Sequence, residues 1–260
     1  MLESKVLIIK IGSNVLTQSN GLPDLDRMQH LVNQIQGLIS SGKKVVLVSS
    51  GAVAFGRQAI PLTDKLNPVL KKQIWASTGQ IRLINQYQKF FEKLNQPIAQ
   101  ILVTKEDFRD RKHFLNMKNC IEALLQQGIL PIINENDTVT ITELMFTDNV
   151  VFASLTAAMI NADTLMLLTN VDGIFTGNPS EPDSKLIEKV AFSMPEVSNY
   201  ISATKSSFGR GGMLTKYAMA KKSADLGIQV IIANGKRDGV LEEFTGKTLR
   251  CTWFEPQKVK

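Results

Sequence analysis

Short, continuous runs of Val, Ile and Leu, separated by longer amphipathic stretches, are the feature that most constrains the fold of this chain. Most of these runs lack in–out alternation, so each is predicted to be a strand buried on both faces, as in a parallel sheet. The predicted strands are Lys5–Ile11, Lys44–Ser49, Ile98–Leu102, Ile129–Ile133, Thr164–Leu168 and Ile228–Ile232, followed by a last strand within Thr248–Phe254.

The stretches between these runs have the apolar spacing of amphipathic helices. Gly42, Gly128 and Gly227 each come just after such a stretch and just before a strand, where glycine commonly ends a helix. The order strand–helix–strand predicts an α/β fold, an α/β/α sandwich around a mainly parallel β-sheet. The predicted helices are Asp24–Ser40, Pro68–Asn95, Asp107–Gln126, Asn149–Ile160 and Met213–Leu226.

The length of 260 residues, 43% of them hydrophobic, is enough for one domain with a sizeable core. We expect a single domain over 1–260, with an N-terminal lobe of about 1–165 and a C-terminal lobe of about 166–260 sharing one sheet. No stretch reaches the roughly 18 uncharged apolar residues of a membrane span, and the first residues lack a signal-peptide pattern. Cys120 and Cys251, the only cysteines, have no metal-ligand spacing. These features predict a reduced, cytoplasmic protein.

The formal net charge of +6 raises the question of an anionic partner. The basic residues are scattered, and pairs such as Lys71-Lys72 fall within helical patterns. Aromatic and basic residues do not alternate as they do in many nucleic-acid interfaces. We therefore interpret the charge as a solvated basic surface, and predict neither a nucleic-acid partner nor a membrane partner.

Residues suited to phosphate chemistry follow the predicted strands. In parallel α/β sheets, ligands bind beyond the carboxyl ends of the strands. Glycines let backbone N–H groups approach an anion closely, a following helix adds its positive end, and a lysine supplies a full charge. The segments at these ends are Lys10 with Gly12-Ser13, Ser49–Ala52, Asn134–Asp137 and Thr169–Gly173, and a further glycine loop, Gly211–Lys216, precedes a helix.

Each of these residues also has a structural interpretation. Lys10 could be a strand-end lysine that reaches solvent, and Ser50-Gly51-Ala52 could be a tight turn into a helix. Asp137 and Asp148 could be helix caps or turn residues. One further match is rejected, because the segment Gly37–Lys44 has lysine where a P-loop requires Ser or Thr, and it leads from a helix into a strand.

Taken together, these segments resemble the amino acid kinase family, and within it the glutamate 5-kinases. The resemblance extends in order over nearly the whole chain. The Asn134–Asp137 run and the Ser-Ser-Gly-Ala sequence are its most specific parts. The matching segments are Val6–Leu16, Val48–Gly56, Asn134–Asp137, Thr169–Pro179 and Gly211–Lys216, with Gly79–Leu83 and Phe114–Asn116 in addition.

The resemblance implies transfer of the γ-phosphoryl group of ATP to the side-chain carboxylate of L-glutamate, giving the L-glutamyl 5-phosphate used in proline biosynthesis. It also implies Mg2+ on the ATP phosphates with no direct protein ligands, possible feedback inhibition by proline, and a homo-oligomer, either a dimer or a tetramer. Two alternatives stay open: an enzyme of the same fold with another acceptor, and a non-catalytic ligand-binding regulator.

The resemblance also assigns roles to residues. Catalysis would fall to Lys10, Lys216 and Asp148. Glutamate would be bound by Ser50, Gly51, Ala52, Asn134, Asp137 and Asn149, with Asp137 as the partner of the substrate ammonium and Gly51 as a backbone donor. The nucleotide would be bound by Lys10, Gly12, Ser13, Thr169, Asn170, Asp172, Gly173, Arg210, Gly211, Gly212, Met213, Leu214, Thr215 and Lys216, with the backbone N–H of Gly12 directed at phosphate.

The chain departs from the family pattern in three respects. Val150 follows Asp148-Asn149 where glutamate kinases usually have a second aspartate. Asn170 stands where Asp is usual, and Arg210 precedes the glycine loop where Thr is common. Many bacterial members also have a C-terminal PUA domain, an RNA-binding-type module, which we do not expect in a chain of this length.

Overall fold

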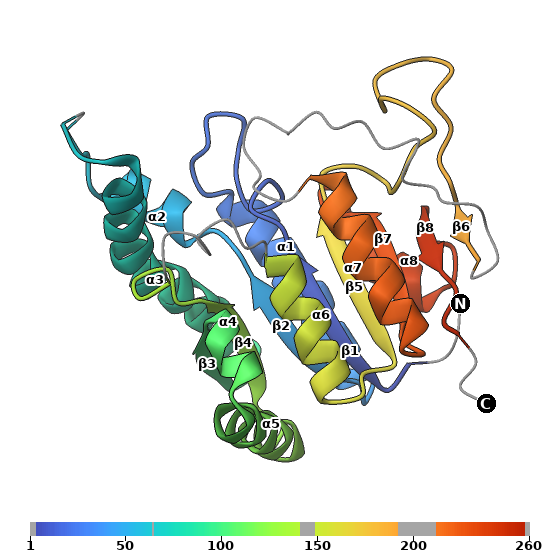
Figure 1. Cartoon of the computed structure of the whole chain (residues 1–260), viewed down its shortest axis with the longest axis horizontal. Helices are drawn as coiled ribbons and strands as arrows, with labels where there is room; N and C mark the ends of the chain where they lie inside the picture. Colours follow the sequence, from blue (N-terminus) through green and yellow to red (C-terminus); the bar gives the residue numbers. More distant parts are fainter. Residues whose placement is uncertain (1–3, 64, 141–148, 192–211, 258–260) are drawn as a thin grey trace.

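The computed structural model describes residues 4–63, 65–140, 149–191 and 212–257. These residues form the predicted α/β/α sandwich, with one central sheet between two layers of helices (Figure 1). The strands are β1 Val6–Ile11, β2 Lys44–Ser49, β3 Ile98–Val103, β4 Leu130–Glu135, β5 Thr164–Thr169, β6 Lys189–Val190, β7 Gln229–Asn234 and β8 Cys251–Phe254. The helices are α1 Leu25–Ser40, α2 Ala52–Ala59, α3 Pro68–Glu92, α4 Lys105–Arg109, α5 Arg111–Gln126, α6 Asn149–Met159, α7 Met213–Asp225 and α8 Val240–Thr245.

The eight-stranded sheet has the order β3-β4-β2-β1-β5-β7-β8-β6. All neighbouring pairs are parallel except β7 and β8, which are antiparallel. Strands β1 to β4 therefore make one half of the sheet and β5 to β8 the other, with β1 and β5 adjacent at the middle. This topology confirms the predicted fold class.

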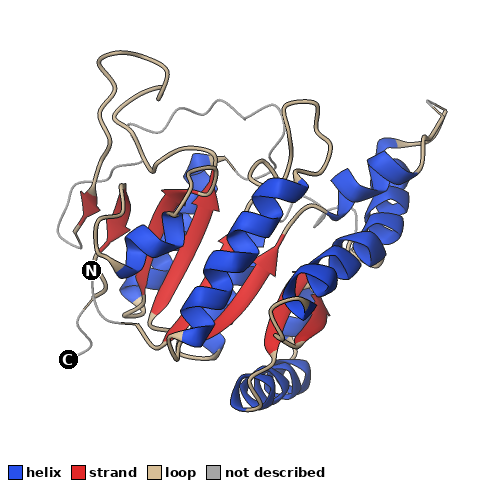
Figure 2. Cartoon of the chain, turned by 180° about the vertical axis from the view of Figure 1, so that it is seen from behind, coloured by secondary structure: helices blue, strands red, loops and turns tan. Residues whose placement is uncertain are grey.

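Side chains of the central strands are buried on both faces of the sheet. In β1, Leu7, Ile9 and Ile11 belong to the core beneath α1, α3 and α8, whereas Ile8 belongs to the core beneath α5, α6 and α7. Figure 2, which is turned by 180° from Figure 1, shows the side of the sheet covered by α1 and α8. Burial on both faces explains why these strands are continuous apolar runs instead of alternating ones.

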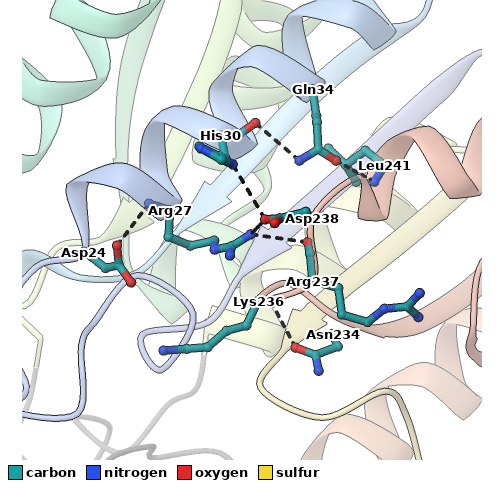
Figure 3. Close-up of polar contacts among 9 residues, drawn as sticks. All are labelled: Asp24, Arg27, His30, Gln34, Asn234, Lys236, Arg237, Asp238 and Leu241. Carbon is teal, nitrogen blue, oxygen red and sulfur yellow. Dashed lines mark hydrogen bonds and ion pairs between the residues drawn. The ribbon is translucent and has the colours of Figure 1, made fainter.

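Polar contacts hold the loop between β7 and α8, and the first turn of α8, against α1 (Figure 3). Arg27 Nη1 lies 2.9 Å from Asp238 Oδ1, and the Leu241 N–H donates to Gln34 Oε1 over 2.9 Å. Because α1 follows β1 and the loop follows β7, these contacts join the two halves of the sheet on one side.

The element bounds differ from the predicted ones in understandable ways. Strands β4, β5 and β7 extend over polar residues at their ends, because backbone pairing continues where the apolar run stops. The predicted helix Asp107–Gln126 is divided by Asp110, which ends α4 and caps α5 by accepting from Lys112 N–H and His113 N–H, both over 2.9 Å. Helices α2 and α8 and the short β6 were not predicted. No helix in the described ranges is long and apolar enough to cross a membrane.

Candidate functional site at the carboxyl edge of the sheet

Those predicted site residues that the structure describes lie at the edge of the sheet where the parallel strands end, which is toward the top of Figure 1. Helices α6 and α7 begin at this edge, and α2 begins three residues beyond the end of β2. The register of the sheet aligns Lys10 with Val48 of β2 and with Leu167 of β5. The end of β1 is therefore flanked by the ends of β2 and β5.

Lys10 is only 3% exposed, so it is not the strand-end lysine reaching bulk solvent that the sequence left open. Its side chain leaves β1 on the same face as Ile8, toward the layer that contains α6. A Cβ added to Gly12 would lie 3.7 Å from Lys10 Nζ, which places the ammonium beside the glycine turn. Lys10 thus brings a positive charge to the carboxyl edge of the sheet.

The turn after β1 differs from the prediction at Gly12. Its N–H donates to the Leu168 carbonyl over 3.1 Å, so it is not available to a phosphate. Glycine is favoured here, because a Cβ would lie 3.2 Å from the same carbonyl oxygen, a tight contact. Within the described ranges, the N–H groups of Ser13 and Asn14 donate to no backbone acceptor, which makes them the candidate backbone donors of this turn.

Asn149, the first residue of α6, connects the ends of β2 and β4. Its Nδ2 donates to the Ser49 carbonyl over 3.0 Å, to Ser50 Oγ over 2.9 Å and to Asn134 Oδ1 over 3.0 Å. Its Oδ1 is buried and has no partner among the described residues. A buried acceptor of this kind is costly unless a ligand donor reaches it. Ser50, Asn134 and Asn149 therefore form one polar cluster, in which Asn149 Oδ1 is an acceptor that a ligand could use.

Gly51 lies between this cluster and α2. Its φ of 113° is in the left-handed region that favours glycine, and it is the N-cap of α2 without a side-chain capping bond. The first N–H groups of α2, beginning at Ala52, therefore face the end of β2 without a side-chain partner at the cap. An anionic group can be bound here by the positive end of the helix.

Asp137 follows β4 and makes an ion pair with Lys72 of α3. The side chains are each only 11% exposed. The sequence predicted Lys72 to be part of a solvated basic surface, and this prediction is wrong. The helix also contacts the same segment through Gln80, whose Oε1 accepts from Asn134 Nδ2 over 2.7 Å. Lys72 and Gln80 therefore contact the candidate site. The sequence analysis gave neither residue a role, although Gln80 lies in the matching segment Gly79–Leu83.

Tyr87 supports the cluster from inside the core. It is fully buried, and its hydroxyl lies 2.8 Å from Ser49 Oγ, which in turn donates to the Ser50 carbonyl over 2.9 Å. Burial raises the pKa of the Tyr87 phenol far above its ordinary value, so the group stays neutral. Val150, the α6 residue at which the resemblance predicts an aspartate, is completely buried in the apolar core between α6 and the sheet.

The predicted nucleotide residues of β5 and its loop lie on the other side of β1. Thr169 ends β5 level with Asn234 of β7, and Thr169 Oγ1 donates to Asn170 Oδ1 over 3.3 Å. The Asp172 carboxylate accepts from Asn234 Nδ2 over 3.1 Å and pairs with Arg250 Nε at 3.0 Å. Asp172 is thus held by protein partners, which orders the loop after β5.

Gly173 has a packing reason to be glycine. A Cβ there would lie 2.3 Å from Thr252 Oγ1 and 2.7 Å from the Thr252 backbone nitrogen. The loop after β5 therefore passes directly over β8. A role for Gly173 in nucleotide binding stays a prediction.

Gly212 is the N-cap of α7 and makes no side-chain capping bond. Met213, Leu214 and Thr215 form the first turn, and Lys216 follows with its side chain half-buried. The N-terminus of α7 thus offers backbone N–H groups and a nearby lysine at the same edge as Lys10. The predicted residues Asp148, Arg210 and Gly211 lie outside the described residues.

In the described part of the chain, no group of three or more His, Cys, Asp or Glu side chains could hold a metal ion. The donors at this edge are ammonium groups, amides, hydroxyls and helix N-termini. Such a set suits an anion, and it suits a metal ion that arrives already bound to phosphate oxygens.

Comparison with known proteins agrees with this chemistry. The sequence matches the amino acid kinase family over residues 5–234. The glutamate 5-kinase of Bacteroides thetaiotaomicron is 48% identical over 252 residues, which is 96% of this chain and 70% of that protein. The glutamate 5-kinase of Chlorobaculum tepidum is 48% identical over 258 residues, which is 98% of this chain and 70% of that protein.

Solved structures share the fold. A carbamate kinase from Giardia lamblia bound to AMP-PNP superimposes with a TM-score of 0.67 at 19% identity, covering 98% of this chain and 99% of that one. A UMP kinase from Ureaplasma parvum gives a TM-score of 0.65 at 16% identity, covering 98% of this chain and all of that one. At these identities the likeness concerns the fold alone.

Proposed function

The chain belongs to the amino acid kinase family, and from this premise we propose that it phosphorylates L-glutamate with ATP, the first step of proline biosynthesis. The γ-phosphoryl group moves to the side-chain carboxylate, and the products are L-glutamyl 5-phosphate and ADP. The observation that carries the proposal is the 48% identity to glutamate 5-kinases over nearly the whole chain. The polar cluster of Ser50, Asn134 and Asn149 supports it.

The chemistry needs positioning and positive charge more than proton transfer. A glutamate side-chain carboxylate is already a nucleophile, so no general base has to remove a proton. A carboxylate oxygen bonds to the γ-phosphorus while the bond to the β–γ bridging oxygen breaks, and ADP leaves with that electron pair. Negative charge accumulates on the transferring group, and fixed cations stabilise it. Lys10 and Lys216 are the proposed cations.

The substrate carboxylates and ammonium have separate partners in this proposal. The N-terminus of α2 at Gly51 and Ala52, with Ser50, receives an anionic group of glutamate. Asp137 and Asn149 Oδ1, which has no partner in the described part of the chain, receive the ammonium, with Asn134 fixing the orientation of Asn149. Asp148 is the proposed carboxylate that orients the lysines.

The nucleotide occupies the other half of the edge. The N-terminus of α7, from Gly212 to Lys216, and the turn at Ser13 bind phosphate, and the loop after β5 binds the rest of the nucleotide. We propose that magnesium enters as MgATP, bound to phosphate oxygens and water, which needs no cluster of protein carboxylates. The lobes 1–165 and 166–260 then correspond to the acceptor and nucleotide sides.

Three further properties belong to the same proposal. We place the protein in the cytoplasm, as a homo-oligomer, with proline as a competitor at the glutamate site. Size-exclusion chromatography with light scattering tests the oligomer. Inhibition that is competitive against L-glutamate but not against ATP tests the proline site.

An acceptor panel tests the function. The purified chain is incubated with ATP and Mg2+ and, in turn, L-glutamate, L-aspartate, N-acetyl-L-glutamate, carbamate and UMP, with ADP formation as the readout. Hydroxylamine converts an acyl phosphate to a hydroxamate, which identifies the carboxyl group as the acceptor. We expect ADP and hydroxamate with L-glutamate, whereas turnover only with another acceptor, or with none, would reject the proposal.

A further inference from the structure

The ion pair between Lys72 and Asp137 is unusual in its burial. Lys72 is 9% exposed as a whole residue, although it lies near the start of a helix whose neighbouring positions include exposed residues. Lysine is almost never buried to this extent unless it is paired. Removing both charges from water is expensive, and apolar residues of similar size often stabilise a protein as well or better. Stability alone is therefore a poor reason for this pair.

Helix α3 holds Lys72 in a fixed position relative to the polar cluster of Ser50, Asn134 and Asn149. Besides the ion pair, Gln73 Nε2 donates to the Thr138 carbonyl over 3.2 Å, and Gln80 accepts from Asn134. Lys72 and Gln80 are eight positions apart and so lie on similar sides of the helix, slightly more than two turns apart. These contacts tie α3 to the segment that follows β4.

The same helix is packed without a gap against α2. A Cβ on Gly79 would lie 1.8 Å from the Ala52 carbonyl oxygen, and a Cβ on Gly56 would lie 1.9 Å from the Trp75 carbonyl oxygen. Backbone therefore meets backbone where the two helices cross. Because α2 begins at the glutamate-binding turn, α3 fixes Lys72 and Asp137 relative to both segments of the proposed acceptor site.

The charges of this pair match one end of the proposed substrate. The α-carbon of glutamate bears one ammonium and one carboxylate, and the complementary receptor is one carboxylate beside one ammonium. An aspartate carboxylate has about four acceptor positions and a lysine ammonium has three N–H donors, so each can keep the other and still bind a substrate group. This argument rests on the proposed function, because it takes an amino acid as the acceptor.

We propose that Lys72 and Asp137 together bind the zwitterionic end of glutamate, with Lys72 donating to the α-carboxylate while Asp137 accepts from the α-ammonium. Lys72 is then a substrate-binding residue that determines specificity. It distinguishes the α-carboxylate, which must be held, from the side-chain carboxylate, which must stay accessible to the γ-phosphoryl group. A lysine that only neutralised Asp137 would make no such distinction.

The test compares L-glutamate with its α-amide, which keeps the ammonium and the side-chain carboxylate but lacks the α-carboxylate charge. Initial rates with saturating MgATP give kcat/KM for both acceptors. For the wild-type enzyme we expect a preference for L-glutamate of about 10- to 100-fold, the range for loss of one hydrogen bond between charged groups. In Lys72→Met, kcat/KM for L-glutamate should fall toward the α-amide value, and the preference should shrink to about threefold or less.

Lys89→Met is the matched control, because Lys89 is an exposed lysine in the last turn of the same helix and should retain the wild-type preference. A Lys72→Met variant that loses activity equally on both acceptors indicates a structural role and overturns the inference. If that variant does not fold, the wild-type comparison still decides, since equal use of both acceptors refutes α-carboxylate recognition. A wild-type enzyme that phosphorylates neither acceptor refutes the proposed function itself.

Discussion

Gly79→Ala tests whether the contact between α2 and α3 positions the acceptor site. In the structure, a Cβ at this position would lie 1.8 Å from the Ala52 carbonyl oxygen and 2.4 Å from the Gly56 nitrogen. Both obstacles are backbone atoms, so no side-chain rotation can relieve them. Restoring a tolerable separation of about 3.2 Å requires α2 and α3 to move apart by about 1.4 Å.

The expected free-energy change combines two opposing effects. Alanine is favoured over glycine within a helix by about 1 kcal/mol. Overpacking typically costs about 1–3 kcal/mol, and a clash with backbone belongs at or above the upper end. The net destabilisation is therefore about 2 kcal/mol or more, which corresponds to a fall in Tm of about 4–8 °C for a domain of this size.

Gly37→Ala provides the matched control. Gly37 lies within α1, and a Cβ there would meet nothing within 4 Å. Only the helix-propensity gain of about 1 kcal/mol remains, so Tm should rise by about 2–4 °C. The same substitution is thus expected to have opposite signs at the two glycines.

Thermal unfolding and steady-state kinetics measure both consequences. Because Ala52 directly follows Ser50 and Gly51, a displaced α2 should raise KM for L-glutamate while leaving KM for ATP nearly unchanged. Gly37→Ala should change neither constant. If Gly79→Ala stabilised the protein as Gly37→Ala does, or left KM for L-glutamate intact, the argument that α3 positions the acceptor site would be refuted.

Three other substitutions or treatments have defined outcomes. Lys10→Met removes the buried ammonium beside Gly12 and should lower kcat by about 10²–10³-fold. Thermal unfolding checks that the variant is folded. An unchanged kcat would show that Lys10 has no part in the mechanism. Burial raises the pKa of Cys251 to about 11, so near pH 8 only about one thiol in a thousand is thiolate, a fraction that rises with pH. Mass spectrometry after iodoacetamide should then find one label, on exposed Cys120, in the native protein and two after unfolding; a native label on Cys251 contradicts its burial. Tyr87→Phe deletes the hydroxyl beside Ser49 and should lower stability by about 1 kcal/mol in denaturant unfolding, and an unaltered midpoint would show that this hydrogen bond contributes nothing.

The strands and the parallel type of the sheet could be predicted, because strands buried on both faces are continuous apolar runs in the sequence. The run Val6–Ile11 is apolar on both faces except at Lys10, and it is a central parallel strand. The strand ends were less predictable, since Asn134 and Glu135 are polar yet pair in register with β3. Backbone pairing sets these ends, and a hydrophobic pattern does not record it.

Helix α2 escaped prediction for a tertiary reason. It is eight residues long and contains Gly56, which lowers helix propensity. The glycine is there because the Trp75 carbonyl of α3 approaches to where a Cβ would be. The contact with α3 therefore requires glycine at position 56, whereas a glycine in the local sequence argues against a helix.

The site was predictable where it lies directly at strand ends and unpredictable where it depends on a distant helix. Ser50 follows β2 and Asn134 lies near the end of β4, and hydrogen bonds join both to Asn149 at the start of α6. Lys72 has the spacing of an ordinary amphipathic helix, and only the folded chain brings it to Asp137. One signal could have suggested Lys72: it lies eight positions before Gln80, so both polar side chains project from similar sides of α3.

Oxygen-isotope transfer tests the central claim most directly. L-Glutamate labelled with 18O in both side-chain carboxylate oxygens is incubated with the enzyme and MgATP, and hydroxylamine then cleaves the acyl phosphate at carbon. If the carboxylate attacks the γ-phosphorus, the released inorganic phosphate contains one 18O atom per ADP formed. Unlabelled phosphate alongside ADP would mean that water is the acceptor, and it would contradict the assignment of this edge of the sheet as a glutamate kinase site.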